Sequence, residues 1–143
     1  MPPLQCTGPV KASLLFRFYS QGIPLGEAGV NAGTAPATKF ITFADTQTGI
    51  AYANPSTQVA IITISALNLA GSPLATQSLT LLPGQHASSF VGALLGLSTL
   101  TGSVQITSTA PIISLSLNFE ASPVFSSLPP GELDSATALS TGR

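Results

Sequence analysis

The side chains that could perform catalysis are few and lie far apart in the sequence. The chain of 143 residues contains one histidine, His86, and one cysteine, Cys6. Nucleophilic catalysis needs a base beside the nucleophile and an orienting group beside the base, and no Gly-x-Ser-x-Gly turn is present to expose a serine. We predict that His86, which follows a Pro-Gly turn, is a surface or loop residue. The sequence therefore predicts no catalytic residues and no enzyme.

Metal and cofactor sites are also not predicted. Zinc needs three or four His, Cys or carboxylate ligands, and the five acidic residues form no Asp-x-Asp-x-Asp-Gly calcium loop. Glu132 and Asp134, near the end of the chain, are interpreted as solvated acids. The glycines between Gly22 and Gly29 precede neither a helix nor a Lys-Ser/Thr pair, so they do not form a phosphate-binding loop. We expect no metal and no cofactor.

Three residues are candidates for contacts with other molecules. Sugars bind to exposed aromatic rings, and Tyr19 and Tyr52 are the candidates because most of the seven Phe lie on inward strand phases. Packing in the core or at its rim is the alternative interpretation for both tyrosines. With a single cysteine, no disulfide within the chain can form. We interpret Cys6 as an exposed free thiol, with a disulfide to another molecule as the alternative.

The charge content narrows the classes of partner. Charged residues make up only 6% of the chain and its formal net charge is −1, whereas about 25% is usual in globular domains. No basic face is available for nucleic acid, and no apolar run approaches the ~18 residues of a membrane-spanning helix. We predict a neutral Ser- and Thr-rich surface, which suits an extracellular or polymeric setting.

The pattern of apolar residues predicts short strands separated by turns. Runs of alternating or β-branched residues indicate strands, whereas clusters of Gly, Pro, Asn and Asp indicate loops. Residues 58–69 are expected to form a central strand covered on both faces, because their β-branched side chains favour a strand. The other predictions are a strand over 10–19, a long loop over Gln21–Thr38 with a short extended piece at Ala28–Asn31, a hairpin of 39–44 with 49–53, a hairpin of 58–69 with 74–82, a strand over 86–90, a short helix over 91–96 that plugs the core, a hairpin of 102–108 with 112–119, and a short extended piece at 124–125.

Together these elements predict an all-β fold with about seven or eight strands and at most one short helix. This spacing of strands and turns is typical of an antiparallel β-sandwich of immunoglobulin-like architecture, with a small barrel as the alternative. The usual buried Cys–Trp–Cys marker is missing because the chain has no Trp. We predict an extended N-terminal arm over 1–8, a single domain over 9–130, and an extended or disordered tail over 131–143.

Several segments resemble a known kind of module. The stretches Thr48–Ser56, Leu79–His86, Gly102–Ser108 and Phe125–Pro129 are similar to uncharacterised all-β, Ig-like modules that occur, often in tandem, in large secreted or surface proteins of environmental bacteria. The resemblance covers Pro9 to Pro130 and consists of turn and strand signatures without a chemical role. It implies an extracellular, non-catalytic module.

Two hypotheses about function follow. The first is a structural module, located outside the cell or at its surface, that associates with copies of itself through strand edges or terminal arms to form a filament, surface layer or tandem stalk. Strand edges are usually protected by charged residues, and this chain has only four basic residues. The alternative is an adhesion module of a larger secreted protein that binds a glycan or a cell-surface protein, through a patch around Tyr52 or the Gln21–Thr38 segment.

Overall fold

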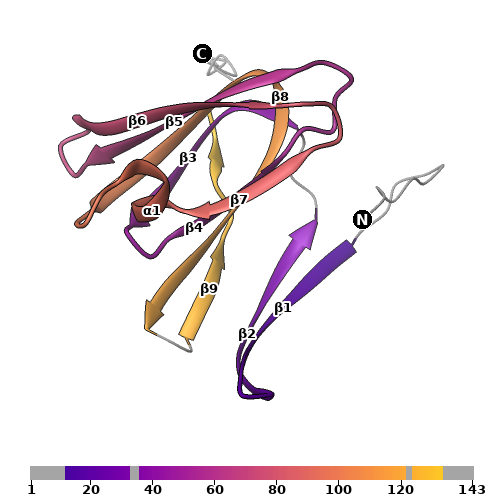
Figure 1. The fold of residues 1–143 in the computed structure, drawn as a ribbon, viewed down its shortest axis with the longest axis vertical. Helices are drawn as coiled ribbons and strands as arrows, with labels where there is room; N and C mark the ends of the chain where they lie inside the picture. The colour runs from indigo at the N-terminus through magenta and orange to yellow at the C-terminus, as the bar shows by residue number, and fades with distance from the viewer. Residues whose placement is uncertain (1–11, 33–35, 122–123, 134–143) are drawn as a thin grey trace, which may run out of the picture.

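One long strand, β8 (Thr101–Ala121), belongs to both layers of a sandwich. The computed structural model describes residues 12–32, 36–121 and 124–133. The N-terminal half of β8 pairs with β3 (Ala37–Asp45) and β5 (Ala60–Asn68), and its C-terminal half pairs with β4 (Gly49–Ala53) and β9 (Val124–Leu128). Figure 1 shows β8 bending from one layer into the other. The prediction of an all-β antiparallel sandwich is therefore confirmed.

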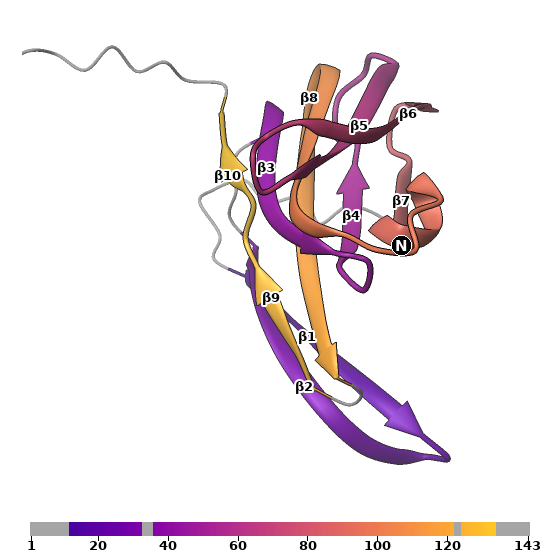
Figure 2. The same ribbon diagram turned by 90° about the vertical axis from the view of Figure 1, so that its left-hand side faces the viewer.

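The remaining strands extend these two layers. In the first layer, β6 (Pro73–Leu81) follows β5, and β10 (Gly131–Glu132) pairs with the other side of β3. In the second layer, β7 (His86–Phe90) pairs with β4. Strands β1 (Ala12–Ser20) and β2 (Ile23–Ala32) form a separate two-stranded sheet. Figure 2 shows this β1–β2 hairpin curving away from the strands of the sandwich.

The core lies between the two layers and is built by alternation. Strand β5 buries every second residue. Ile62 and Ile64 are both 0% exposed, whereas Ile61, on the outer face of the first layer, is 51% exposed. The prediction that this strand is covered on both faces is therefore wrong, although its central position and its hairpin with β6 are confirmed. From the second layer, Ile50 and Tyr52 enter the same core.

A short helix, α1 (Val91–Leu95), closes one end of the core. Val91 is fully buried, and Leu94 and Leu95 pack against the core cluster. The helix ends at Gly96, whose φ of 66° is the left-handed conformation that favours glycine. The predictions of strand β7, of this helix and of its role as a plug are confirmed.

The predicted loop over Gln21–Thr38 is wrong, because most of it forms β2. The turn is confined to Gln21 and Gly22, which both have positive φ, at 50° and 78°. Two residues with positive φ match the twist of a tight hairpin. Pro24, Gly26 and Gly29 lie within β2, which pairs only with β1 among the described strands, and such an edge strand tolerates them.

The predicted hairpin of 39–44 with 49–53 is also wrong in its pairing. Both strands exist, as β3 and β4, but they belong to different layers. The turn between them is held locally, because Asp45 Oδ1 accepts hydrogen bonds from Gln47 N at 2.8 Å and from Thr48 Oγ1 at 3.0 Å. This turn carries the chain from one layer to the other instead of folding it back beside itself.

A second predicted hairpin, 102–108 with 112–119, is one continuous strand. Pro111 was expected to turn the chain, yet it lies inside β8. The pairing with β5 ends at Ser108 and the pairing with β4 begins at Ile113. Proline is tolerated between these two points because β8 is changing partners there and needs no ladder hydrogen bond from residue 111.

The described residues form ten strands, more than expected, because β2 and β10 were not predicted. Gly131 and Glu132, assigned to the tail, pair with β3, and Leu133 N donates to Lys39 O at 3.0 Å. The rest of the predicted tail, the N-terminal arm over 1–8 and Cys6 lie outside the described residues. The side chains of the apolar phase of β1 are likewise outside the described set, so the burial of that phase stays a prediction.

We predict that Gly102→Ala destabilises the fold. A Cβ at Gly102 would lie 2.1 Å from Leu67 O, a backbone atom that cannot move without disturbing β5. Overpacking of this kind costs about 3 kcal/mol, measured as the free energy of unfolding in urea. Gly29→Ala is the matched control, since nothing lies within 4 Å of its new Cβ. Equal stability of the two variants would contradict the close packing of β5 on β8.

Candidate functional site

The two candidate tyrosines lie in contrasting places. Tyr52, on β4, points into the core and is 4% exposed, so it is not an open aromatic platform for a ligand and the alternative of core packing holds. Burial raises the pKa of the Tyr52 phenol above its ordinary value, since the charged form would lose hydration. Tyr19, on the β1–β2 hairpin, is 52% exposed. Only Tyr19 remains available for contact with another molecule.

The described residues hold no constellation for metal chemistry. No group of three or more His, Cys, Asp or Glu is close enough within them to hold a metal ion. His86 is exposed on β7, where it lies opposite Ala53. A search of the same residues found no helix with the length and apolar character needed to span a membrane.

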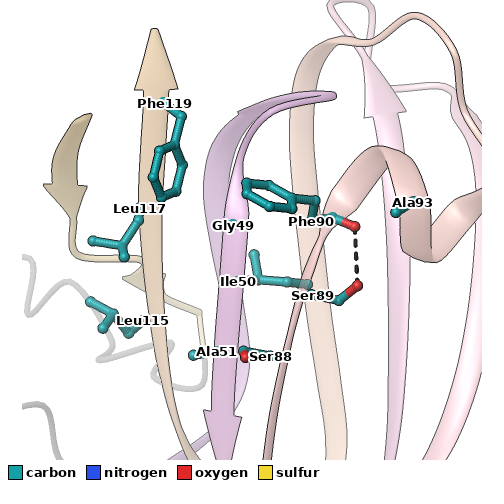
Figure 3. Close-up of a pocket in the computed structure, with 10 residues that line it drawn as sticks. All are labelled: Gly49, Ile50, Ala51, Ser88, Ser89, Phe90, Ala93, Leu115, Leu117 and Phe119. Atoms are coloured by element: carbon teal, nitrogen blue, oxygen red, sulfur yellow. Dashed lines mark hydrogen bonds between the residues drawn. The ribbon is translucent and has the colours of Figure 1, made fainter. Parts of the chain in front are cut away.

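The described residues form an apolar groove on the outer face of the second layer. Its floor is β4, and its walls are β8 on one side and β7 with α1 on the other. The groove has a volume of about 450 Å³, within the usual range for ligand sites. Figure 3 shows the lining side chains around β4. They are Gly49, Ile50, Ala51, Ser88, Ser89, Phe90, Ala93, Leu115, Leu117 and Phe119.

Strand alternation and register explain the shape of this groove. On β4, Ile50 and Tyr52 face the core, which leaves the small residues Gly49, Ala51 and Ala53 on the outer face. The register places large residues of β8 beside them: Leu117 opposite Gly49, Leu115 opposite Ala51 and Ile113 opposite Ala53. A row of small residues beside a row of large ones produces a trough along one strand.

An aromatic pair forms one end of the groove. The Phe90 and Phe119 rings meet edge to face, with centroids 5.3 Å apart and an interplanar angle of 67°. Both rings lie near Gly49, since a Cβ there would be 3.4 Å from Phe119 Cε2 and 3.9 Å from Phe90 Cε1. The two rings therefore contact each other beside a position that has no side chain. Figure 3 shows the Phe119 ring on one side of Gly49 and the Phe90 ring on the other.

The groove continues toward His86 as a second, shallower hollow of about 240 Å³. This hollow shares Ala51, Ser88 and Leu115 with the groove. No charged side chain is among the described residues that line either part, apart from the titratable His86. The surface is therefore suited to a neutral, apolar partner.

Sequence reasoning missed this groove, although its signal is visible in the sequence. The sequence predicts that Ile113, Leu115, Leu117 and Phe119 belong to one strand of a hairpin. In the structure Ser114 and Ser116, 3% and 1% exposed, face the core, and Ile113 is 38% exposed on the outer face. The polar phase of this half of β8 is inside and the apolar phase outside, the reverse of the usual arrangement.

No family model, curated protein or solved structure matches this chain.

We predict that Tyr52 makes the fold less stable at alkaline pH. Its pKa is raised in the folded state, so folding favours the protonated phenol. Stability is then fully present below the unfolded-state pKa near 10 and is lost as the pH rises through the folded-state pKa. Each unit of difference between the two pKa values corresponds to about 1.4 kcal/mol.

The measurement is the free energy of unfolding between about pH 8 and about pH 11, for the wild type and Tyr52→Phe. The Phe variant should lose less stability over this range. Tyr19→Phe, at an exposed position, is the control for general alkaline effects. If Tyr52→Phe and the wild type decline in parallel, the argument from burial is wrong.

Proposed function

We propose that this chain is a non-catalytic, extracellular structural module that associates with copies of itself into a filament, surface layer or tandem stalk. The observation that carries the proposal is the outer edge of the first layer. Strand β6 pairs with β5 and with no other described strand. It is nine residues long, with the sequence PLATQSLTL, and contains no charged residue.

Natural proteins protect long edge strands with lysines, inward charges, prolines or bulges, because an open edge can pair with another chain. The one proline of β6, Pro73, is at its start and leaves the following residues unprotected. Strand β7, the edge of the second layer, is also uncharged but spans only five residues before α1 begins. Shortness is itself a protection, so β6 is the stronger candidate for pairing.

The register identifies the backbone groups available at this edge. Ile61 N–H donates to Thr109 Oγ1 on β8 at 2.9 Å, so residue 61 directs its backbone groups away from β6. In an antiparallel pair, two residues opposite each other either both direct their N–H and C=O groups toward the partner strand or both direct them away from it. Thr80, opposite Ile61, therefore directs its N–H and C=O to the open edge. Adding a strand from another copy would satisfy them.

The low charge supports the same proposal. With a formal net charge of −1 over 143 residues, two copies experience little mutual repulsion. The outward residues of the first layer are mostly hydroxyls, and pairs such as Thr63 with Ser78, and Ser65 with Thr76, are 3.0 Å apart. A neutral, hydroxyl-covered surface suits an extracellular assembly. The resemblance to modules of secreted and surface proteins supports this location.

A second candidate is an adhesion module that binds a glycan or a protein. The observation that favours it is the uncharged groove with Phe90, which is 44% exposed, at its rim. Aromatic rings at the rim of a groove can stack on a sugar or receive an apolar peptide. This candidate requires the groove alone and makes no use of the open edge of β6.

We predict that Thr80→Pro weakens self-association. Proline removes an N–H that faces the open edge, and it leaves the hydrogen bonds between β6 and β5 intact. The protein concentration at which assemblies appear in light scattering should rise at least about tenfold, which corresponds to about 1.4 kcal/mol of lost interaction.

Thr80→Ala is the matched control, because it removes the same side chain and keeps the N–H. Circular dichroism and thermal unfolding establish that both variants fold. Thr80→Lys offers an independent test, since a lysine at the edge disfavours pairing without changing the backbone. Indistinguishable assembly of the Pro, Lys and Ala variants would exclude the β6 edge as an interface.

A further inference from the structure

We infer that the apolar groove on the second layer is the docking site for the β1–β2 hairpin of a second copy, with Tyr19 as its anchoring side chain. The inference rests on the proposed self-association and adds a second interface, separate from the edge of β6. It assigns a role to two apolar features that the described fold leaves open.

The β1–β2 hairpin exposes an unusual amount of apolar surface. Tyr19 is 52% exposed and Ile23 61%, both near the turn, and Leu15 and Leu25 are also exposed. A two-stranded sheet by itself is marginally stable in water, so it needs a surface to pack on. The base of the hairpin has one, since Ser127 Oγ on β9 donates to Gly29 O at 2.7 Å and Ala28 is buried. Its outer part, around Tyr19 and Ile23, is exposed among the described residues.

The turn of the hairpin lies far from the groove of its own chain. Figures 1 and 2 both show the end of the hairpin away from β4 and β7, the strands that form the floor and one wall of the groove. Tyr19 therefore meets a groove only on a neighbouring molecule. The hairpin projects and the groove is concave, so the two surfaces have complementary shapes.

The charges of the two surfaces are compatible. The exposed ion pair of the hairpin, Arg17 Nε with Glu27 Oε2 at 2.6 Å, joins adjacent strands, so its two charges largely cancel. The groove presents no acid or base among its described lining residues. A hairpin with no net charge can enter it without leaving an unpaired charge in an apolar setting, which would oppose binding.

The Phe90–Phe119 pair fits an aromatic anchor. Tyrosine is enriched among the residues that dominate binding energy, and aromatic rings favour edge-to-face contact. A Tyr19 ring would pack against the exposed side of Phe90, which is 44% exposed, with its hydroxyl able to remain in water.

The size of the contact indicates its strength. A buried tyrosine covers about 150–250 Å², so Tyr19 with the neighbouring aliphatic residues would bury roughly 500 Å². Stable interfaces bury about 800 Å² per partner, so this contact is weak by itself. Because the hairpin and the groove are different surfaces, the contact is head to tail and propagates into an open chain unless it closes into a ring.

The test uses the Thr80→Pro background, which silences the β6 edge. In this background, Tyr19→Ser removes the anchor and Ala51→Glu places a charge on the floor of the groove. Each variant alone should be monomeric by sedimentation velocity at concentrations where Thr80→Pro alone forms oligomers. An equimolar mixture of the two should form dimers and nothing larger, because only one intact hairpin and one intact groove can meet.

Phe90→Ser replaces Ala51→Glu if the charged variant fails to fold. Ile61→Ser, which removes an exposed aliphatic residue from the outer face of the first layer, is the matched control and should leave association unchanged. If Tyr19→Ser or the groove variant associates as strongly as the background, or if the background is monomeric at every concentration, this inference is overturned. The β6 interface is judged separately, by comparing Thr80→Pro with Thr80→Ala.

Discussion

The continuity of β8 is the constraint on which the rest of the structure depends. Its even-numbered residues stay on the core side from Gly102 to Ser116, with Ser108 half-buried, although the pairing with β3 shifts register between Ala37 and Lys39. The apolar residues do not keep this phase, because they change from Val104, Ile106 and Ile112 to Ile113, Leu115 and Leu117. Since the buried phase stays even while the apolar phase becomes odd, the second half of the strand presents apolar side chains to the outside.

Two serines and a threonine that this arrangement buries have hydrogen-bond partners, whereas the buried Asn118 Oδ1 has none. The hydroxyls of Thr42 and Ser116 are 3.0 Å apart and join the two layers inside the core. Ser116 Oγ also donates to Leu128 O, and Ser114 Oγ donates to Ala51 O at 3.4 Å. Buried polar groups with partners avoid most of the penalty of lost hydration. The second layer therefore accommodates serines on its inner face. Its apolar side chains lie on the outer face, where they can contact another molecule.

Local patterns predicted the strands well and their partners poorly. The β-branched run over residues 58–69 and the turn at Gly71 and Ser72 were enough to predict the β5–β6 hairpin, and Gly96 was enough to predict the end of α1. Pairing depends on distant residues: nothing local in Asp45–Thr48 distinguishes a turn within one sheet from a turn between two. Pro111 indicated a turn because its tolerance inside β8 depends on strands far away in sequence. The groove was missed for the same reason, since its shape requires three strands in register.

Two kinds of open surface follow from this architecture: an uncharged edge at β6, and a projecting hairpin with a groove that can receive it. We propose that both mediate contact with further copies of the chain. The most direct measurement is sedimentation velocity of the wild-type protein across a dilution series, with negative-stain electron microscopy of the concentrated samples. The account predicts assemblies that grow with concentration and appear as ordered chains or layers. A monomer at every concentration would contradict it, and the groove would then be better explained as a binding site for a different molecule.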